Sequence, residues 1–147
     1  MMTMTMSAGS NAQRSRYNRD AVLSATPVRL LTMLYDRLLL ELNRAEAAQQ
    51  RQDWQTASDN LLHAQAIVSE LSTSLIVEAW DGGEGLFSLY TYVSTAMVSA
   101  NTSRNPARTH ECIVLLEPLR QTWHEAADLL PATPAPATGR SGELGIG

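Results

Sequence analysis

The side chains that most often perform chemistry are few in this chain and lie far apart along it. The histidines are His63, His110 and His124, and the last two would lie about 21 Å apart if they shared one helix. No HExxH motif and no i,i+4 pair of histidines occurs, so the spacing that brings two imidazoles to one metal ion is missing. The sequence therefore predicts no metal site.

The other candidates for catalysis also have structural interpretations. Cys112 is the only cysteine, so it cannot form an intramolecular disulfide, and its apolar surroundings predict a buried, inert thiol. Glu78, Asp81 and Glu84 surround a glycine cluster, but they lack EF-hand spacing and are typical of a solvated turn. Neither a phosphate-binding loop nor a GxSxG motif is present. We therefore expect no enzymatic activity and no cofactor.

Length and composition are those of one globular domain. The chain has 147 residues, of which 44% are hydrophobic and 18% charged, enough to bury a core without a metal or a disulfide. No apolar run approaches the roughly 18 residues that span a bilayer, and the N-terminus lacks the apolar segment of a secretory signal. A cytoplasmic protein without membrane insertion is therefore predicted.

The charged residues are unevenly distributed. The formal net charge is −4, and all eleven basic residues are Arg. Residues 1–26 carry three Arg against one Asp, a net +2, whereas residues 27–147 carry eight Arg against 14 acidic residues, a net −6. The sequence thus predicts a basic arm followed by an acidic body, and such a body is a poor nucleic-acid partner.

Glycine positions and capping residues indicate where long helices begin and end. No glycine lies between Ser10 and Asp81, or between Leu86 and Thr138, as long helices require. Thr26-Pro27 is a typical helix start, which predicts a helix over about 27–50. Apolar residues occupy more than one stripe of that segment, so this helix is central or has a second face for another role.

Heptad seams define three further helices. Asp53 is a candidate N-cap for a helix over about 53–79, and a third helix is predicted over about 84–101. A fourth is predicted over about 106–130, where Pro118 predicts a kink or a restart. Residues 17–130 should form an all-α, antiparallel up-down four-helix bundle with an N-terminal arm. Residues 1–16 and the Pro/Ala/Gly-rich residues 131–147 are predicted to be disordered.

Four parts of the sequence resemble the FliS family of flagellar chaperones, which bind flagellin before export. Residues 17–27 are similar to the family's opening Tyr…Val…Ala-Ser-Pro, and residues 30–36 to its Leu-x-x-Met-Leu-Tyr-Asp signature. The other matching segments are residues 64–71 with 86–92, and residues 116–123. The resemblance extends in order from residue 17 to about residue 128.

The resemblance implies a four-helix bundle that binds the C-terminal segment of flagellin in the cytoplasm. Covering that segment would prevent premature polymerisation and keep the subunit competent for flagellar type III export. The family also implies an N-terminal arm that covers part of the client groove when no client is bound. The export gate would be a further partner. The oligomeric state is left open, since an exposed groove also permits a homodimer formed by arm exchange.

Partner-binding residues are predicted on the arm, on the first helix and on the later helices. In that order they are Tyr17, Val22 and Leu23; Leu34, Tyr35 and Leu38; and Phe87, Tyr90 and Trp123. A Leu or aromatic residue at heptad spacing is also typical of a core, and Tyr90 and Trp123 both lie on seams. Tyr17 is the strongest candidate, because it stands outside the seams in a polar segment.

Two alternatives come from other classes of protein. Trp80-Asp81-Gly82 resembles the Trp-x-Gly turn of small secreted WXG-type proteins, although this chain has twice the helices of one such hairpin. A generic helical protein-interaction module is the other alternative. Export of the chain itself would favour the first, and neighbouring flagellar genes would favour the chaperone.

Overall fold

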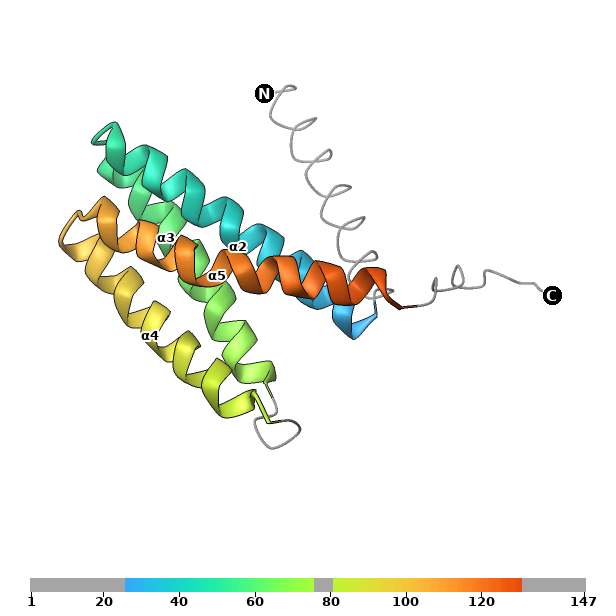
Figure 1. Cartoon of the computed structure of the whole chain (residues 1–147). Helices are drawn as coiled ribbons and strands as arrows, with labels where there is room; N and C mark the ends of the chain where they lie inside the picture. Colours follow the sequence, from blue (N-terminus) through green and yellow to red (C-terminus); the bar gives the residue numbers. More distant parts are fainter. Residues whose placement is uncertain (1–25, 76–80, 131–147) are drawn as a thin grey trace, which may run out of the picture. The chain divides into compact units, whose positions relative to one another are not determined.

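The computed structural model describes residues 26–75 and 81–130, and nearly all of these residues are helical (Figure 1). The four helices are α2 (Pro27–Gln50), α3 (Trp54–Ser74), α4 (Gly83–Thr102) and α5 (Pro106–Asp128). Residues 32–125 form one compact unit, and the described residues 26–31 and 126–130 belong to a second. The predicted arm and both predicted disordered termini lie outside the described residues.

Side-chain caps explain where three of the helices begin. Thr26 Oγ1 accepts a hydrogen bond from the backbone N–H of Arg29 (3.3 Å) at the start of α2. Asp53 Oδ1 accepts one from the N–H of Thr56 (3.2 Å) at the start of α3. Asn105 Oδ1 accepts one from the residue that follows Pro106, at 3.0 Å. Each cap satisfies an N–H group that the first helical turn leaves without a partner.

The turns after α2 and α4 have the same backbone geometry. Gln52 and Arg104 both adopt positive φ, 63° and 52°, at a position that often holds glycine. In each turn the next N–H closes a bond to a carbonyl five residues back: Asp53 to Ala48 (2.8 Å) and Asn105 to Ala100 (3.0 Å). These bonds satisfy carbonyl groups at the helix end and reverse the chain within a few residues.

Polar contacts within residues 32–125 establish the directions of α2 and α5. His110, near the start of α5, contacts Glu46 near the end of α2 (3.1 Å). His124, near the end of α5, contacts Asp36 near the start of α2 (2.7 Å). The two helices are therefore antiparallel neighbours, as Figure 1 also shows. The predicted all-α four-helix bundle is confirmed.

A buried glutamine joins three of the helices. Gln49 of α2 is 2% exposed. Its Nε2 donates to the carbonyl of Ala100 in α4 (3.2 Å), and its Oε1 accepts from Thr109 of α5 (2.7 Å). Asn101 Nδ2 donates to Ser58 Oγ (3.1 Å), which joins the end of α4 to the start of α3. Hydrogen-bonded side chains of this kind fix the arrangement of the helices at the end of the bundle where the turns after α2 and α4 lie.

The core consists of the seams predicted for α3 and α4, together with the inner side of α2. The buried apolar residues of α3 are Ala57, Leu61, Ala64, Val68 and Leu71, and those of α4 include Leu86, Tyr90, Val93, Met97 and Ala100. Burial of one such Leu or Met stabilises the fold by about 1.5–3 kcal/mol. In α5 the seam is buried at Cys112 and Leu116 but only half-buried at Trp123, and Leu130 lies beyond the end of the helix and is exposed.

One sequence expectation about a helix end was wrong. α3 ends at Ser74 rather than near residue 79, because Leu75 takes an extended backbone (ψ 124°). At Pro118 the sequence predicted a kink or a restart. α5 continues through Pro118 as one helix, which excludes the restart, and the kink stays a prediction. Pro118 is exposed and so is Val114, whose carbonyl loses its partner, so water can satisfy that carbonyl at the helix surface.

No helix in the described ranges is both long and apolar enough to cross a bilayer.

Candidate partner-binding surface

A hydrogen-bonded tyrosine pair lies at the centre of the bundle. The hydroxyl oxygens of Tyr35 (α2) and Tyr90 (α4) are 2.7 Å apart, and the side chains are 0% and 1% exposed. Burial raises the pKa of both hydroxyls above the usual range, since an ionised phenol would lose its hydration. Both groups therefore remain neutral and hold α2 against α4.

Trp123 of α5 completes this aromatic cluster. Its ring meets Tyr35 edge to face, with centroids 6.2 Å apart and an interplanar angle of 64°. This geometry is favourable for aromatic pairs. Trp123 is half-buried, so the cluster extends from the core towards the surface at α5.

The structure separates the predicted partner-binding residues by exposure. Tyr35, Leu38 and Tyr90 lie in the core and offer no side-chain surface to a partner in this conformation. Tyr35 of α2 meets Tyr90 of α4 and Trp123 of α5 instead. Phe87 is 47% exposed. Leu34 is half-buried, and like Phe87 and Trp123 it remains a predicted contact residue.

The three predicted arm residues, Tyr17, Val22 and Leu23, lie outside the described residues.

Other apolar side chains are exposed that the sequence interpretation did not single out. They are Met33 and Leu40 on α2, Leu62 on α3, Tyr92 and Val98 on α4, and Val114 on α5. Met33 and Leu40 are seven residues apart, and that spacing was the signal available in the sequence. Several helices of the described part thus present apolar groups that a helical or extended segment could cover.

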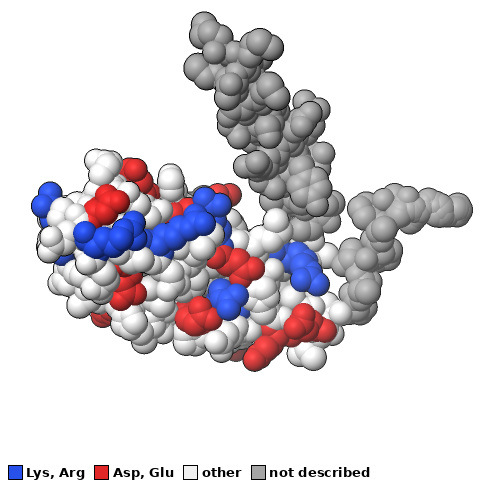
Figure 2. All heavy atoms as spheres, turned by 90° about the horizontal axis from the view of Figure 1, so that it is seen from above, with Lys and Arg blue, Asp and Glu red and all other residues white. Residues whose placement is uncertain are grey.

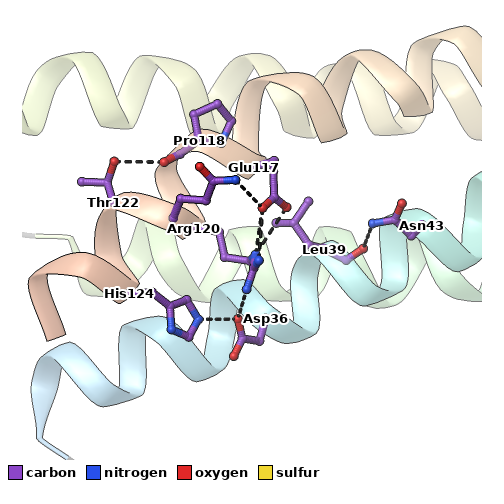
Figure 3. Close-up of polar contacts among 9 residues, drawn as sticks. Asp36, Leu39, Asn43, Glu117, Pro118, Arg120, Thr122 and His124 are labelled. Atoms are coloured by element: carbon purple, nitrogen blue, oxygen red, sulfur yellow. Dashed lines mark hydrogen bonds and ion pairs between the residues drawn. The ribbon is translucent and has the colours of Figure 1, made fainter. Parts of the chain in front are cut away.

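A polar network joins the outer side of α2 to α5 (Figure 3). Asp36 Oδ1 accepts from Arg120 (2.9 Å) and contacts His124 Nε2 (2.7 Å). Arg120 also pairs with Glu117, one turn earlier on α5 (3.1 Å). Partial burial of Asp36 acts to raise its pKa, but the hydrogen bonds from His124 and Arg120 outweigh burial and lower it. The lowered pKa favours the ionised form of Asp36, which faces the Arg120 guanidinium.

A shallow groove of about 280 Å³ lies beside this network, between α2 and α5. Its lining combines apolar and polar side chains: Asp36, Leu39, Leu40, Asn43, Glu117 and Arg120. Figure 3 shows the Leu39 side chain beside Glu117 and Arg120, and Asn43 one turn further along α2, where its amide donates to the carbonyl of Leu39 (2.7 Å). The groove can receive an apolar side chain from a partner, with polar groups at its rim.

The Cys112 thiol and the possible metal ligands are the remaining groups that could perform chemistry. Cys112 is buried, and burial raises the pKa of its thiol to about 11. Among residues 26–75 and 81–130, no three His, Cys, Asp or Glu side chains are placed to hold a metal ion.

The fold and the exposed apolar groups define the class of this protein as an all-helical bundle with several candidate surfaces for protein partners. The family follows from comparison with known proteins. The family model "Flagellar protein FliS" matches residues 9–129, and the chain belongs to the FliS family. The resemblance predicted from the sequence is therefore confirmed.

Two curated relatives and one solved structure are similar to this chain. The flagellar secretion chaperone FliS of Bacillus subtilis (strain 168) is 27% identical over 110 residues, which are 75% of this chain and 82% of the relative. The protein of the same name from Escherichia coli (strain K12) is 30% identical over 109 residues, which are 73% and 80%. A crystal structure titled as a flagellar chaperone from bacteria matches with a TM-score of 0.64. It covers 81% of this chain and 98% of its own, at 18% identity, and supports the fold.

Proposed function

We propose that this protein is a cytoplasmic export chaperone that binds the C-terminal segment of flagellin. Binding would keep flagellin from polymerising early and would hold it competent for flagellar type III export. The observation that carries the proposal is the FliS family match over residues 9–129, together with two relatives named as flagellar secretion chaperones. The WXG-like alternative depends on residues 80–82 alone, whereas the FliS family match covers residues 9–129.

The distribution of apolar surface supports such a role. A disordered amphipathic segment can fold onto exposed apolar groups and gain buried area that offsets its ordering entropy. The described part of the chain offers such groups on α4, where Phe87 is prominent, and on the half-buried residues Leu34 and Trp123. We propose these three residues as client contacts, with Tyr17, Val22 and Leu23 contributed by the N-terminal segment.

Two further interactions belong to the proposal. The export gate would receive the chaperone–client complex, and a homodimer would protect the client surface when flagellin is absent. The family resemblance supports the export gate as a partner, and the exposed apolar groups of the bundle support the homodimer.

Co-purification with flagellin from the same genome tests the proposal. The chaperone is mixed with full-length flagellin or with flagellin lacking its C-terminal helical segment, and the complexes are separated by size exclusion in high salt. A complex with the full-length protein alone is expected, because apolar contacts tolerate salt. Absence of a complex with either form would refute flagellin as the client.

A pair of variants on one helix tests the contact surface. Phe87 and Val98 are both exposed on α4, at 47% and 49%, so replacing either with Ala should leave the fold intact. We expect Phe87→Ala to weaken flagellin binding about tenfold, the loss of roughly 1.4 kcal/mol. Val98→Ala is the matched control and should bind as the wild type does. Equal effects of the two variants would remove Phe87 from the contact set.

A further inference from the structure

The outward side of α2 repeats with a period of seven residues. Between residues 33 and 51 the exposed positions fall into three rows: Met33, Leu40 and Ala47; Asp36, Asn43 and Gln50; and Arg37, Arg44 and Arg51. We call these nine residues the outer α2 face. A seven-residue repeat is the pattern along which a second helix can pack continuously. The inner side of α2 already packs in the bundle, so the repeat on the outer face needs another explanation.

The arginine row makes this face basic on an otherwise acidic body. The outer α2 face carries three Arg against one Asp, whereas residues 27–147 have a net charge of −6. Figure 2 shows basic side chains gathered in a row on the same side of the molecule. Arg37 pairs with the buried Glu41 (2.8 Å) and Arg51 with Asp53 (3.7 Å), but Arg44 makes none of the described ion pairs. Arg44 is therefore the cation most available to a partner.

On the side away from the arginine row, the outer α2 face borders the groove between α2 and α5. Leu40 is 41% exposed and lines that groove together with Asn43 and Glu117. One long surface thus offers a cavity of about 280 Å³ for an apolar side chain on one edge and a row of guanidinium groups on the other.

We propose that the outer α2 face binds an amphipathic helix of a second partner protein, and that the polar side of this helix is acidic. An apolar residue of the partner enters the groove beside Leu40, and carboxylates lie over Arg44. The surface from residue 33 to residue 51 is about 27 Å long, the length of a helix of roughly 18 residues. The proposal extends beyond flagellin binding and does not depend on it.

The chemistry of the face favours an acidic helix over a nucleic acid. A phosphate backbone would gain nothing from Met33 and Leu40, and it would be repelled by Asp36 and Glu117 at the groove. Only one of the three rows is apolar, so the complex should be transient, with a dissociation constant in the micromolar range.

A synthetic helix provides the probe. It contains three heptads with Leu at the seam positions and Glu on both flanks, and a control peptide carries Lys in place of every Glu. Each peptide is titrated into the full-length chain, with binding followed by fluorescence anisotropy and the contact site mapped by NMR shifts. The Glu peptide should bind with shifts confined to the outer α2 face and the neighbouring side of α5. The Lys peptide should bind at least tenfold more weakly.

Matched variants show whether peptide binding depends on the outer α2 face or only on the overall charge and apolar surface of the protein. Arg44→Glu should weaken binding of the Glu peptide about tenfold, whereas Arg108→Glu, the same change on α5, should alter it less than twofold. Leu40→Ser should also weaken binding, and Val98→Ser on α4 should not. Equal effects within either pair would overturn the proposal, as would NMR shifts centred on another surface.

Two other occupants of the face are distinguished in the same experiment. Light scattering that shows a dimer, made monomeric by Arg44→Glu, would assign the face to a second copy of this chain and overturn the proposal. Displacement of the peptide by flagellin would assign the face to the client and also overturn it. Simultaneous binding of peptide and flagellin would support a separate partner.

Discussion

The pair of buried tyrosine hydroxyls provides the most direct test of how this bundle is held together. Tyr35 and Tyr90 share one hydrogen bond of 2.7 Å, and neither side chain has appreciable exposure. Phe has the same ring without the hydroxyl, so Tyr35→Phe and Tyr90→Phe remove one partner each without opening a large cavity. Both residues were predicted from the sequence to contact a partner, so the same variants also test that role.

The expected change in the free energy of unfolding depends on which hydroxyl each variant leaves buried without its partner. A single Tyr→Phe change leaves the other hydroxyl buried and without its partner, which should lower the free energy of unfolding by about 1–3 kcal/mol. The double variant removes both hydroxyls, so no orphaned hydroxyl remains, and its loss should be about 1 kcal/mol or less. The two changes should therefore be strongly non-additive, with a coupling energy of about 1–5 kcal/mol.

Urea unfolding followed by helical circular dichroism measures this coupling in the four proteins of the cycle. Flagellin binding is then compared for each variant under conditions where all four remain folded, and it should be unchanged if the pair only supports the core. Additivity within about 0.5 kcal/mol would refute the reasoning about the shared bond. A loss of flagellin binding without a loss of stability would show instead that the tyrosines contact the client.

Three further predictions concern a turn, the thiol and the network between α2 and α5. Gln52→Gly should raise the free energy of unfolding by about 0.5 kcal/mol, since glycine tolerates positive φ. Arg104→Gly should bring no gain, because it also removes the guanidinium that lies 5.3 Å from the Trp54 ring centroid; thermal melts compare the two. Cys112, with a thiol pKa of about 11, should react with Ellman's reagent at pH 8 only after urea unfolds the protein, and rapid reaction of the native protein would contradict its burial. The lowered pKa of Asp36 predicts a stabilising contribution that is complete above its unfolded pKa of about 3.9 and lost as the pH falls through the folded value. Melting curves of wild type and Asp36→Asn should accordingly differ at pH 7 and converge as the pH falls below the folded pKa of Asp36, and a constant difference would rule this linkage out.

Helix starts and the seams of α3 and α4 could be predicted because their signals are local. Thr26 and Asp53 cap helices through N–H groups only a few residues away. The heptad seam of α3 faces the core from Ala57 to Leu71, as its spacing predicts. Family membership was likewise apparent from short motifs in order along the chain, before any contact between helices was known.

The exposure of residues on α2 could not be predicted in the same way. Leu34, Tyr35, Leu38 and Leu40 are all apolar and close in sequence, yet Tyr35 and Leu38 are buried whereas Leu40 is 41% exposed. A helix with apolar residues on more than one stripe can be buried on either side. The choice depends on which neighbours surround it, and those neighbours come from residues far along the chain.

The sequence by itself therefore determined the helix starts, the seams of α3 and α4 and the family, because capping and heptad patterns act over a few residues. Only the tertiary structure decided which stripe of α2 is buried and that Asp36 meets Arg120 and His124, which lie more than 80 residues away along the chain. The tertiary structure also showed that α5 continues through Pro118, where Pro118 and Val114 are both exposed. Burial and long-range pairing depend on how the helices pack together, and the sequence pattern of one helix does not specify that packing.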